Sequence, residues 1–351
     1  MGTAAVREQK VGGANLDWGS LFFSHQDVHC HVQYKWRGGT WDKGAEIKEP
    51  YMNMHVMANV FHYGQAIFEG QKVFHCKDGK VRIFRDAANF GRMTRGAERL
   101  GMPSMPQEMF HEAIDRAIRA NLDFVPPYGS NGALYVRPFM VGSGKQLGLG
   151  PSDEFLFTVV VAPVGSYYKT AGLTPIPCKV IDDFDRAAPQ GVGQVKCAGN
   201  YAADIVPSKK AKEEGFPIGL YLDAKEHRYI EEFNTSNFVA ISKDGKTYIT
   251  PDSQSVLESV TNKCLEDLAR DHGLQVERRR IDFDAEVANF GEVGAVGTAV
   301  VITAIKSITR GTTVHEFKAP DVLQKLHDAV RAIQVGEAPD THGWLRELSA
   351  A

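Results

Sequence analysis

The segment GVGQVKCAGNY, residues 191–201, places one lysine among small and apolar residues. No charged residue lies within the five positions that follow Lys196. Such neighbours can withdraw an ammonium group from water and lower its pKa, which suits a lysine that attacks a carbonyl and holds a Schiff base. A solvated lysine on a strand edge is the alternative, and local sequence alone favours it because most lysines are solvated. The segment therefore needs support from the rest of the chain.

Two segments on the C-terminal side of Lys196 have a composition that suits the binding of polar groups. EEFNTSNF, residues 231–238, follows a predicted strand, and a buried carboxylate there could keep a pyridine nitrogen protonated. The same residue types also favour simple turns. In GEVGAVGTAV, residues 291–300, glycines three apart precede Thr298 and leave room for a phosphate beside the backbone. A tight strand connection is the alternative.

Arginines on the N-terminal side are candidates for binding anions. Arg137 lies in the strand-like LYVRP, where a buried guanidinium would need an anionic partner such as a substrate carboxylate. Arg92, Arg95 and Arg99 share one helix face, which by default is solvated. GSGK, residues 142–145, lacks the remaining residues of a phosphate loop. No metal site is predicted, because the pair His29 and His31 has no third ligand at a familiar spacing.

Hydrophobic periodicity and turn residues predict helices and strands in both halves of the chain. We expect a helix over residues 54–68, a hairpin over 71–84, a helix capped by Asp86 that runs to residue 100, and a helix over 106–123. Strands are expected at 133–141, 154–164, 218–222 and 238–241, a strand pair at 296–305, and further helices at 201–214, 259–272 and 320–333.

Composition excludes several classes of protein. The 351 residues contain 40 Lys and Arg against 43 Asp and Glu, a net charge of −3, and no basic stripe, so neither nucleic acid nor a membrane is expected as a partner. No apolar run reaches the length of a membrane span, and the first residues do not form a secretory signal. We therefore expect a cytoplasmic protein, with an organelle not excluded. The five cysteines are scattered, which predicts reduced thiols.

These segments, in the same order along the chain, resemble the fold-type IV pyridoxal-phosphate enzymes, and most closely the branched-chain amino acid aminotransferases. The resemblance runs from about residue 15 to residue 344. It is carried by FHYGQAIFEG (61–70), FRDAANFGRM (84–93), LYVRPF (134–139), APVGSYY (162–168), GVGQVKCAGNYAA (191–203), EEFNTSNF (231–238) and VGTAVVIT (296–303).

The resemblance implies a two-domain α+β and α/β architecture, the D-amino acid aminotransferase-like fold. A small α+β domain would cover residues 1–165, an interdomain loop residues 166–175, and a larger cofactor-binding domain residues 176–351. The cofactor would be pyridoxal 5′-phosphate, and the assembly would be a homodimer.

The resemblance also implies roles for individual residues. Lys196 would form the internal aldimine and then move a proton as general base and acid. Glu232 would face the pyridine nitrogen and Tyr201 the phenolate oxygen. The phosphate would be held by Arg92, Thr235, Thr298 and the backbone of Val260 and Thr261. The substrate pocket would be lined by Phe23, Tyr63, Phe68, Tyr135, Arg137, Leu149, Tyr167 and Ala299, with Arg137 receiving the distal carboxylate of glutamate or 2-oxoglutarate.

The implied activity is transamination of leucine, isoleucine and valine with 2-oxoglutarate, by a ping-pong mechanism that yields branched-chain 2-oxo acids and glutamate. D-amino acid transamination and aminodeoxychorismate lyase chemistry on the same fold are alternatives, as is a non-catalytic binding module. Two departures from the family pattern stand out. The phosphate-binding turn reads Leu257-Glu258-Ser259 without the usual proline, and Asn234 stands where many relatives carry glycine.

Overall fold

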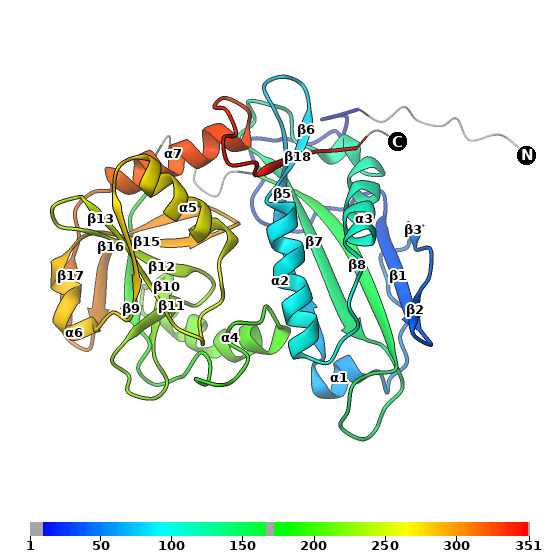
Figure 1. The fold of residues 1–351 in the computed structure, drawn as a ribbon, viewed down its shortest axis with the longest axis horizontal. Coiled ribbons are helices and arrows are strands. Elements are labelled where there is room, and N and C mark those ends of the chain that lie inside the picture. Colours follow the sequence, from blue (N-terminus) through cyan, green and yellow to red (C-terminus); the bar gives the residue numbers. More distant parts are fainter. Residues whose placement is uncertain (1–9, 166–171, 350–351) are drawn as a thin grey trace, which may run out of the picture. The chain divides into compact units, whose positions relative to one another are not determined.

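The computed structural model describes residues 10–165 and 172–349. The chain divides into two compact units, which are described separately (Figure 1): unit 1 is Met1–Tyr167 with Gln334–Ala351, and unit 2 is Tyr168–Ile333. Most of the predicted interdomain loop, residues 166–171, lies outside the described residues. Within the described ranges no helix is both long and apolar enough to cross a membrane. The five cysteines are free and buried, which confirms the prediction of reduced thiols.

Unit 1 is built on one antiparallel sheet with the strand order β18-β6-β5-β7-β8-β1-β2, to which β3 adds beside β1 and β4 beside β7. Its two longest strands, β7 and β8, coincide with the predicted 133–141 and 154–164, and the predicted hairpin is β5 and β6. The bounds are β1 His31–Arg37, β2 Thr40–Trp41, β3 Ala45–Ile47, β4 Ala66–Phe68, β5 Gln71–His75, β6 Val81–Phe84, β7 Ala133–Gly142, β8 Glu154–Val164 and β18 Leu345–Glu347.

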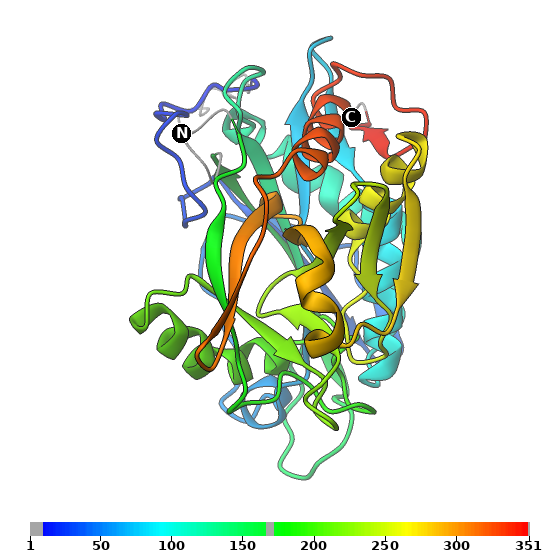
Figure 2. The same ribbon diagram turned by 90° about the vertical axis from the view of Figure 1, so that its left-hand side faces the viewer.

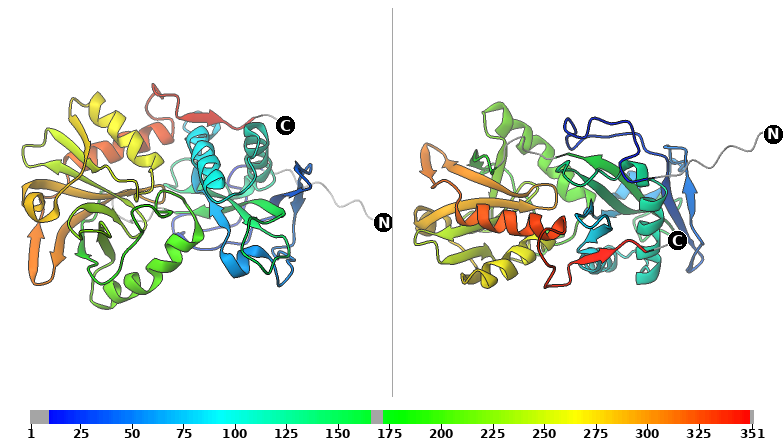
Figure 3. Two further views of the ribbon diagram at one scale, coloured as in Figure 1. Left: turned by 60° about the horizontal axis from the view of Figure 1, so that its bottom comes forward. Right: turned by 90° about the horizontal axis from the view of Figure 1, so that it is seen from above.

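Two amphipathic helices, α2 (Asp86–Arg99) and α3 (Gln107–Arg119), lie side by side in unit 1 (Figures 1 and 3). α3 buries Phe110, Ile114 and Ile118 and packs against β1 and β8. The Phe110 ring stacks on Phe157 of β8 at 6.1 Å between centroids and meets Phe90 of α2 at 5.4 Å. The short 3₁₀ helix η1 (Leu122–Phe124) follows α3. The apolar face of α3 therefore covers the sheet.

Two local predictions in unit 1 are wrong. The helix expected over residues 54–68 is reduced to α1 (Asn59–Tyr63), because Gly64 adopts φ 63° and the following residues pair with β7 as β4. Asp86 does not cap α2: the N-cap is Arg85, which makes no side-chain cap bond. The Asp86 carboxylate instead accepts a hydrogen bond from Arg346 Nε at 2.5 Å, a long-range contact that local sequence does not reveal.

The C-terminal segment differs from the predicted domain boundary. We expected residues 176–351 to form one domain, but β18 pairs with β6, so the segment from Gln334 onward belongs to unit 1. The Trp344 carbonyl accepts the Arg85 N–H at 2.7 Å, and Arg346 forms a bidentate pair with Asp115 at 2.7 and 3.1 Å. A three-residue strand has too little periodicity to show its pairing partner in the sequence.

Unit 2 contains a sheet with the strand order β11-β10-β9-β16-β15-β12-β13-β14, and an additional β11–β12 pairing closes part of it into a ring. β17 pairs with β16, and Figure 2 shows this orange hairpin beside the green β9. The strand bounds are β9 Ile176–Val180, β10 Ile218–Leu222, β11 Ile230–Phe233, β12 Asn237–Ser242, β13 Thr247–Pro251, β14 Gln275–Arg279, β15 Phe290–Gly297, β16 Val301–Arg310 and β17 Thr313–Glu316.

The strands of unit 2 surround a core of buried aliphatic and aromatic side chains, among them Phe233, Phe238 and Phe290. The helices that accompany the sheet are α4 (Ala198–Glu213), which packs against β10, α5 (Val260–Asp271), which packs against β14 and β15, and α6 (Phe283–Glu286), η2 (Val287–Asn289) and α7 (Val322–Gln334). α4, α5 and α7 correspond to the predicted helices, although α4 begins three residues before the predicted start at Tyr201. The apolar core sets the positions of the strand ends.

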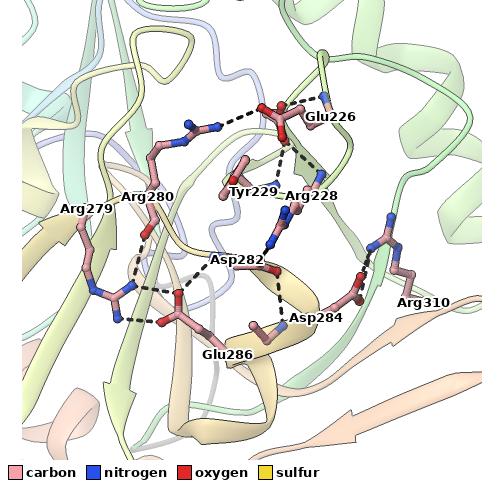
Figure 4. A network of polar contacts seen from close by, with 11 residues as sticks. Glu226, Arg228, Tyr229, Arg279, Arg280, Asp282, Asp284, Glu286 and Arg310 are labelled. Atoms are coloured by element: carbon pink, nitrogen blue, oxygen red, sulfur yellow. Dashed lines mark hydrogen bonds and ion pairs between the residues drawn. The ribbon is translucent and has the colours of Figure 1, made fainter.

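A network of ionic contacts holds the beginning of β11 (Figure 4). Arg280 lies 3.6 Å over the Tyr229 ring and pairs with Glu226, while Arg228 Nε donates to Asp282 at 2.6 Å. The Ile230 N–H also donates to the Ile281 carbonyl at 2.9 Å. These contacts fix the strand that carries Glu231 and Glu232.

Replacing Arg346 with methionine should destabilise unit 1, because it leaves the buried carboxylates of Asp86 and Asp115 without their cation. We expect the free energy of unfolding to fall by about 3 kcal/mol, as for other broken buried ion pairs. Urea unfolding followed by intrinsic fluorescence measures the loss. The control is Lys80→Ala, which removes an exposed ion pair with Glu347, the neighbour of Arg346 on β18. This variant should lower the free energy of unfolding by less than about 1 kcal/mol. Equal losses in the two variants would contradict the prediction.

Candidate active site

Lys196 lies at the entrance to α4 and contacts a tyrosine one helical turn further along. Its ammonium Nζ is 2.8 Å from Tyr201 Oη and 5.1 Å from the centroid of the Tyr201 ring. The lysine is half-buried. The structure thus brings together two residues that the sequence analysis named as partners of the same group.

The loop before Lys196 has a fixed shape. The Asn200 side-chain amide donates to the carbonyls of Val192 and Val195, at 2.8 and 2.9 Å. At Gly193 an added Cβ would lie 2.0 Å from the Ser255 carbonyl oxygen, so only glycine allows the loop to approach this closely. Gly193 therefore lets two backbone segments pack together. Cys197, in extended conformation, is the N-cap residue of α4, which begins at Ala198.

Glu232 lies on β11 with 2% of its surface exposed. Its Oε1 accepts the Leu257 N–H at 3.1 Å, and its Oε2 accepts a hydrogen bond from Asn237 Nδ2 at 3.1 Å. Burial raises the pKa of Glu232 to about 7, against the opposite influence of the Arg186 guanidinium, the Leu257 N–H and the Lys196 ammonium. A cation placed beside this carboxylate would favour its ionised form.

Sequence analysis missed Arg186, which lies in the loop after β9 and is buried. Its Nη1 is 2.8 Å from Glu232 Oε1. The only signal in the sequence was an arginine followed by nine uncharged residues before Lys196. No periodic pattern links residue 186 to residue 232, because the contact joins a loop to a strand more than forty positions away.

Two turns that carry hydroxyl side chains lie at the same end of the unit 2 sheet. Thr235 is in the turn from β11 to β12, and Thr298 is in the turn from β15 to β16. β12 and β15 pair with Asn237 opposite Val296, which places the turns next to each other. A Cβ added at Gly297 would lie 3.6 Å from Ser236 Oγ. The two predicted phosphate-binding threonines are thus on adjacent turns, and Ala299 is exposed on the second of them.

The start of α5 provides free backbone donors at this end of the sheet. Ser259 caps the helix through Oγ, which accepts the Asn262 N–H at 3.1 Å. The Asn237 side chain donates to the Leu257 carbonyl at 2.9 Å, which ties the start of the helix to β12. Among the described residues, the N–H groups of Val260 and Thr261 have no acceptor. A helix N-terminus of this kind attracts a phosphate group.

The missing proline in Leu257-Glu258-Ser259 does not prevent the helix from starting at Val260. Ser259 supplies the cap, and Glu258 forms an ion pair with Lys263 in the first turn. These two contacts replace the conformational restriction that a proline would impose.

Asn234 connects the β11–β12 turn to α4. Its Nδ2 donates to Ser208 Oγ at 2.8 Å, and Ser208 in turn donates to Asp204 Oδ2 at 2.6 Å. Tyr221 of β10 donates to the other oxygen of Asp204 at 2.5 Å, and burial is the main cause that raises the pKa of Tyr221. This chain of bonds, which sequence analysis missed, borders a cavity of about 630 Å³ that Tyr201 and Thr235 also line.

Four of the predicted substrate-pocket residues form a cluster in unit 1. The Arg137 guanidinium lies 4.8 Å from the Phe68 ring and 5.1 Å from the Tyr135 ring, and its Nη2 donates to Tyr135 Oη at 3.0 Å. Phe23 meets Tyr135 edge-on at 4.8 Å. Gly70 makes room for this arrangement, since a Cβ there would lie 1.9 Å from Tyr135 Oη. Arg137 Nε is buried and has no hydrogen-bond partner among the described residues.

The remaining predicted substrate-pocket residues are not in this cluster. Tyr63 ends α1 and its hydroxyl donates to the Leu147 carbonyl, and Leu149 is 85% exposed in the same loop. Tyr167 lies outside the described residues. Ala299 belongs to unit 2.

Arg92 is on α2 of unit 1, whereas the other predicted phosphate ligands are in unit 2. It is buried, and its Nε and Nη2 form a bidentate pair with Glu69 at 2.6 and 2.7 Å. The helix face is therefore not solvated at this position. Because Glu69 holds two nitrogens of the planar Arg92 guanidinium, the orientation of its third nitrogen is fixed as well.

Comparison with known proteins agrees with these features. A family model described as amino-transferase class IV matches residues 66–308. A branched-chain-amino-acid aminotransferase of Haemophilus influenzae is 39% identical, covering 94% of this chain and 98% of the relative. Another enzyme of that name, from Helicobacter pylori, is 41% identical, covering 95% of this chain and 98% of the relative.

Solved structures share the fold. The branched-chain amino acid aminotransferase of Escherichia coli superposes with a TM-score of 0.74 at 26% identity, over 91% of this chain and 100% of that one. The enzyme from Thermobaculum terrenum in its PLP form gives a TM-score of 0.76 at 22% identity, over 93% and 100% of the chains. The expected fold class is confirmed. With the family model spanning most of both units and these relatives covering nearly the whole sequence, the chain belongs to the class IV aminotransferases.

Proposed function

We propose that this protein is a pyridoxal-phosphate-dependent aminotransferase that moves the amino group between leucine, isoleucine or valine and 2-oxoglutarate. The observation that carries the proposal is the contact of Lys196 with Tyr201 in the same unit as the buried Glu232. The names of the relatives from Haemophilus influenzae and Helicobacter pylori support the branched-chain substrates.

The donor set in unit 2 fits the cofactor. The buried carboxylate of Glu232 suits a protonated pyridine nitrogen, and the Tyr201 hydroxyl suits a phenolate oxygen. The free N–H groups of Val260 and Thr261, with the hydroxyls of Thr235 and Thr298 on adjacent turns, suit a phosphate. When bound, pyridoxal phosphate supplies the electron sink that the side chains themselves lack.

Each of the site residues then has a specific role. Lys196 Nζ would hold the cofactor through its carbonyl carbon; once the substrate amine has displaced it, Lys196 would take a proton from the substrate Cα and deliver it to the C4′ carbon of the cofactor, as general base and acid. Tyr201 orients Lys196 through the 2.8 Å contact. Arg92, with its fork held by Glu69, is proposed as a further phosphate ligand. The remaining residues position these groups and limit the access of water.

Substrate selection is proposed to depend on the Arg137 cluster. The rings of Phe68, Tyr135 and Phe23 offer an apolar surface to a branched side chain. The same rings flank a guanidinium whose Nε is buried without a partner, which suits the distal carboxylate of glutamate. One cluster thus offers surfaces for both kinds of side chain.

We further propose that the protein is a homodimer. Several apolar side chains near α1 are exposed: Phe61 on the helix, Val56 in the segment before it, and Leu147, 81% exposed, in the loop whose carbonyl accepts the Tyr63 hydroxyl. Exposed apolar side chains on neighbouring segments are typical of interfaces. A second copy packing on these residues would remove them from water. The cytoplasmic location stays a prediction; a 36% identical relative from Humulus lupulus is named as mitochondrial.

The purified protein mixed with pyridoxal phosphate should show a visible absorption band that leucine removes and 2-oxoglutarate restores. Lys196→Ala should show neither change and should lose transaminase turnover by about 1,000-fold or more, because the proton-transfer group is absent. Lys225→Ala, at an exposed lysine in the turn after β10, should behave as the unchanged protein. If leucine, isoleucine and valine leave the band intact and D-alanine removes it, the branched-chain assignment is wrong.

Arg137→Met should separate the two half-reactions. Loss of a charged hydrogen bond costs about 1.5 to 3 kcal/mol, so kcat/KM for glutamate should fall by about 10- to 100-fold. The value for leucine should change by less than about threefold, because methionine keeps the apolar contacts. Single-turnover absorbance measurements with each amino acid provide both numbers. A parallel loss for leucine and glutamate would refute this role of Arg137.

The double variant Leu147→Asp with Leu149→Asp should shift the protein from the mass of two chains to the mass of one, because two carboxylates would be desolvated in the interface. Sedimentation velocity measures the mass. Val314→Asp, at an exposed apolar residue on β17, is the control and should leave the mass unchanged. A single-chain mass for the unmodified protein would disprove the homodimer.

A further inference from the structure

Arg186 and Glu232 form an ion pair that is withdrawn from water on both sides. The side chains are 3% and 2% exposed, and Arg186 Nη1 is 2.8 Å from Glu232 Oε1. Arg186 comes from the loop between β9 and α4, and Glu232 from β11. Arg186 Nε and Nη1 are both buried and make no hydrogen bond within the described residues, so the contact of Nη1 with Glu232 is an ion pair without a hydrogen bond. Burying two charges costs several kcal/mol for each ion, so such a pair is an expensive way to join a loop to a strand.

The contacts of Glu232 are divided unequally between its two oxygens. Within the described residues, Oε1 forms the ion pair with Arg186 and accepts the Leu257 N–H, whereas Oε2 accepts a hydrogen bond only from Asn237 Nδ2. The Asn237 amide also donates to the Leu257 carbonyl at 2.9 Å, so its direction is fixed. A carboxylate oxygen can accept two hydrogen bonds, and Oε2 therefore has one position left. That position can accept an N–H from a bound group.

The groups around Glu232 have opposite effects on its pKa. Burial and the neighbouring Glu231 carboxylate raise the pKa of Glu232, whereas Arg186, the Leu257 N–H and Lys196 lower it. Arg186 comes first among the lowering influences. Without it, burial would act against fewer opposing groups, and the pKa of Glu232 would be higher, which favours the neutral carboxyl. A neutral carboxyl would no longer favour a proton on a group bonded to Oε2.

We propose that Arg186 is a positioning residue for the reaction: it holds Glu232 as a carboxylate with Oε2 directed away from the ion pair, so that the pyridine nitrogen of the cofactor keeps its proton. This inference rests on the proposed function, in which Glu232 faces that nitrogen. The guanidinium contacts the carboxylate directly at Oε1, and it would lie further from a pyridine nitrogen bonded to Oε2. Its charge therefore favours the ionic arrangement of carboxylate and protonated nitrogen over the neutral one.

If Arg186 only joined its loop to β11, substitutions of Arg186 would have different effects. That role would depend only on a contact between the loop and β11, and any side chain that restores the contact would replace Arg186. The proposed role depends on the positive charge. Arg186→Gln keeps a donor without the charge, Arg186→Lys keeps the charge, and Arg186→Met keeps neither.

The experiment loads each variant with pyridoxal phosphate labelled with ¹⁵N at the ring nitrogen and records the ¹⁵N chemical shift at saturating cofactor. The unchanged protein and Arg186→Lys should give the shift of a protonated pyridine. Arg186→Gln and Arg186→Met should move toward the shift of a neutral pyridine, as should Glu232→Gln. In Arg186→Gln and Arg186→Met, kcat should fall by about tenfold or more, while KM for leucine changes by less than about threefold.

The possible outcomes distinguish the proposed role of Glu232 from the proposed role of Arg186. If Glu232→Gln moves the shift and Arg186→Gln does not, Glu232 keeps its assigned role and the inference about Arg186 is overturned. If Glu232→Gln leaves a protonated nitrogen, the assigned role of Glu232 fails, and the inference fails with it. If Arg186→Met does not fold, the Gln and Lys variants still decide, because they differ from each other in charge.

Discussion

The buried carboxylate of Glu232 is the feature on which the geometry of the candidate site depends. Three separate parts of unit 2 contact this carboxylate. Arg186 comes from the loop before α4, the Leu257 N–H from the segment just before α5, and Asn237 from β12. A buried carboxylate cannot remain without partners, so each of these elements is held at a fixed distance from β11. The free N–H groups of α5 and the two threonine turns lie at one end of the unit 2 sheet, the end at which Asn237 begins β12.

Unit 1 uses ionic pairs in a comparable way. Arg346, near the C-terminus, joins Asp86 at the start of α2 to Asp115 on α3, and Glu69 holds two nitrogens of Arg92 on the same α2. The helix that carries Arg92 is therefore fixed near its beginning by the end of the chain and at its middle by a buried glutamate. The Arg137 cluster depends instead on ring packing and on the absence of a side chain at Gly70.

Much of the fold was predictable, and the errors share one cause. The β5–β6 hairpin and the helices α3, α5 and α7 carry strong local signals, and the structure has them close to the predicted bounds. The segment 54–68 looked helical because its apolar spacing fits a helix, yet pairing of β4 with β7 overrides that preference. Asp86 was assigned as a cap for the same reason, although a distant arginine uses its carboxylate. Local patterns do not report partners that are far away in the sequence.

By itself the sequence determined the type of most elements with a clear hydrophobic period, segment 54–68 being the exception, together with the order of the family motifs and the identity of the lysine, tyrosine and carboxylate that carry the proposed chemistry. The tertiary structure alone decided which groups meet. The Arg186 contact with Glu232, the bond chain from Asn234 to Tyr221, and the return of residues 334–351 to unit 1 all join segments without shared periodicity. The reason is that burial forces charged and polar groups to find partners, and the nearest partner in space need not be near in the chain.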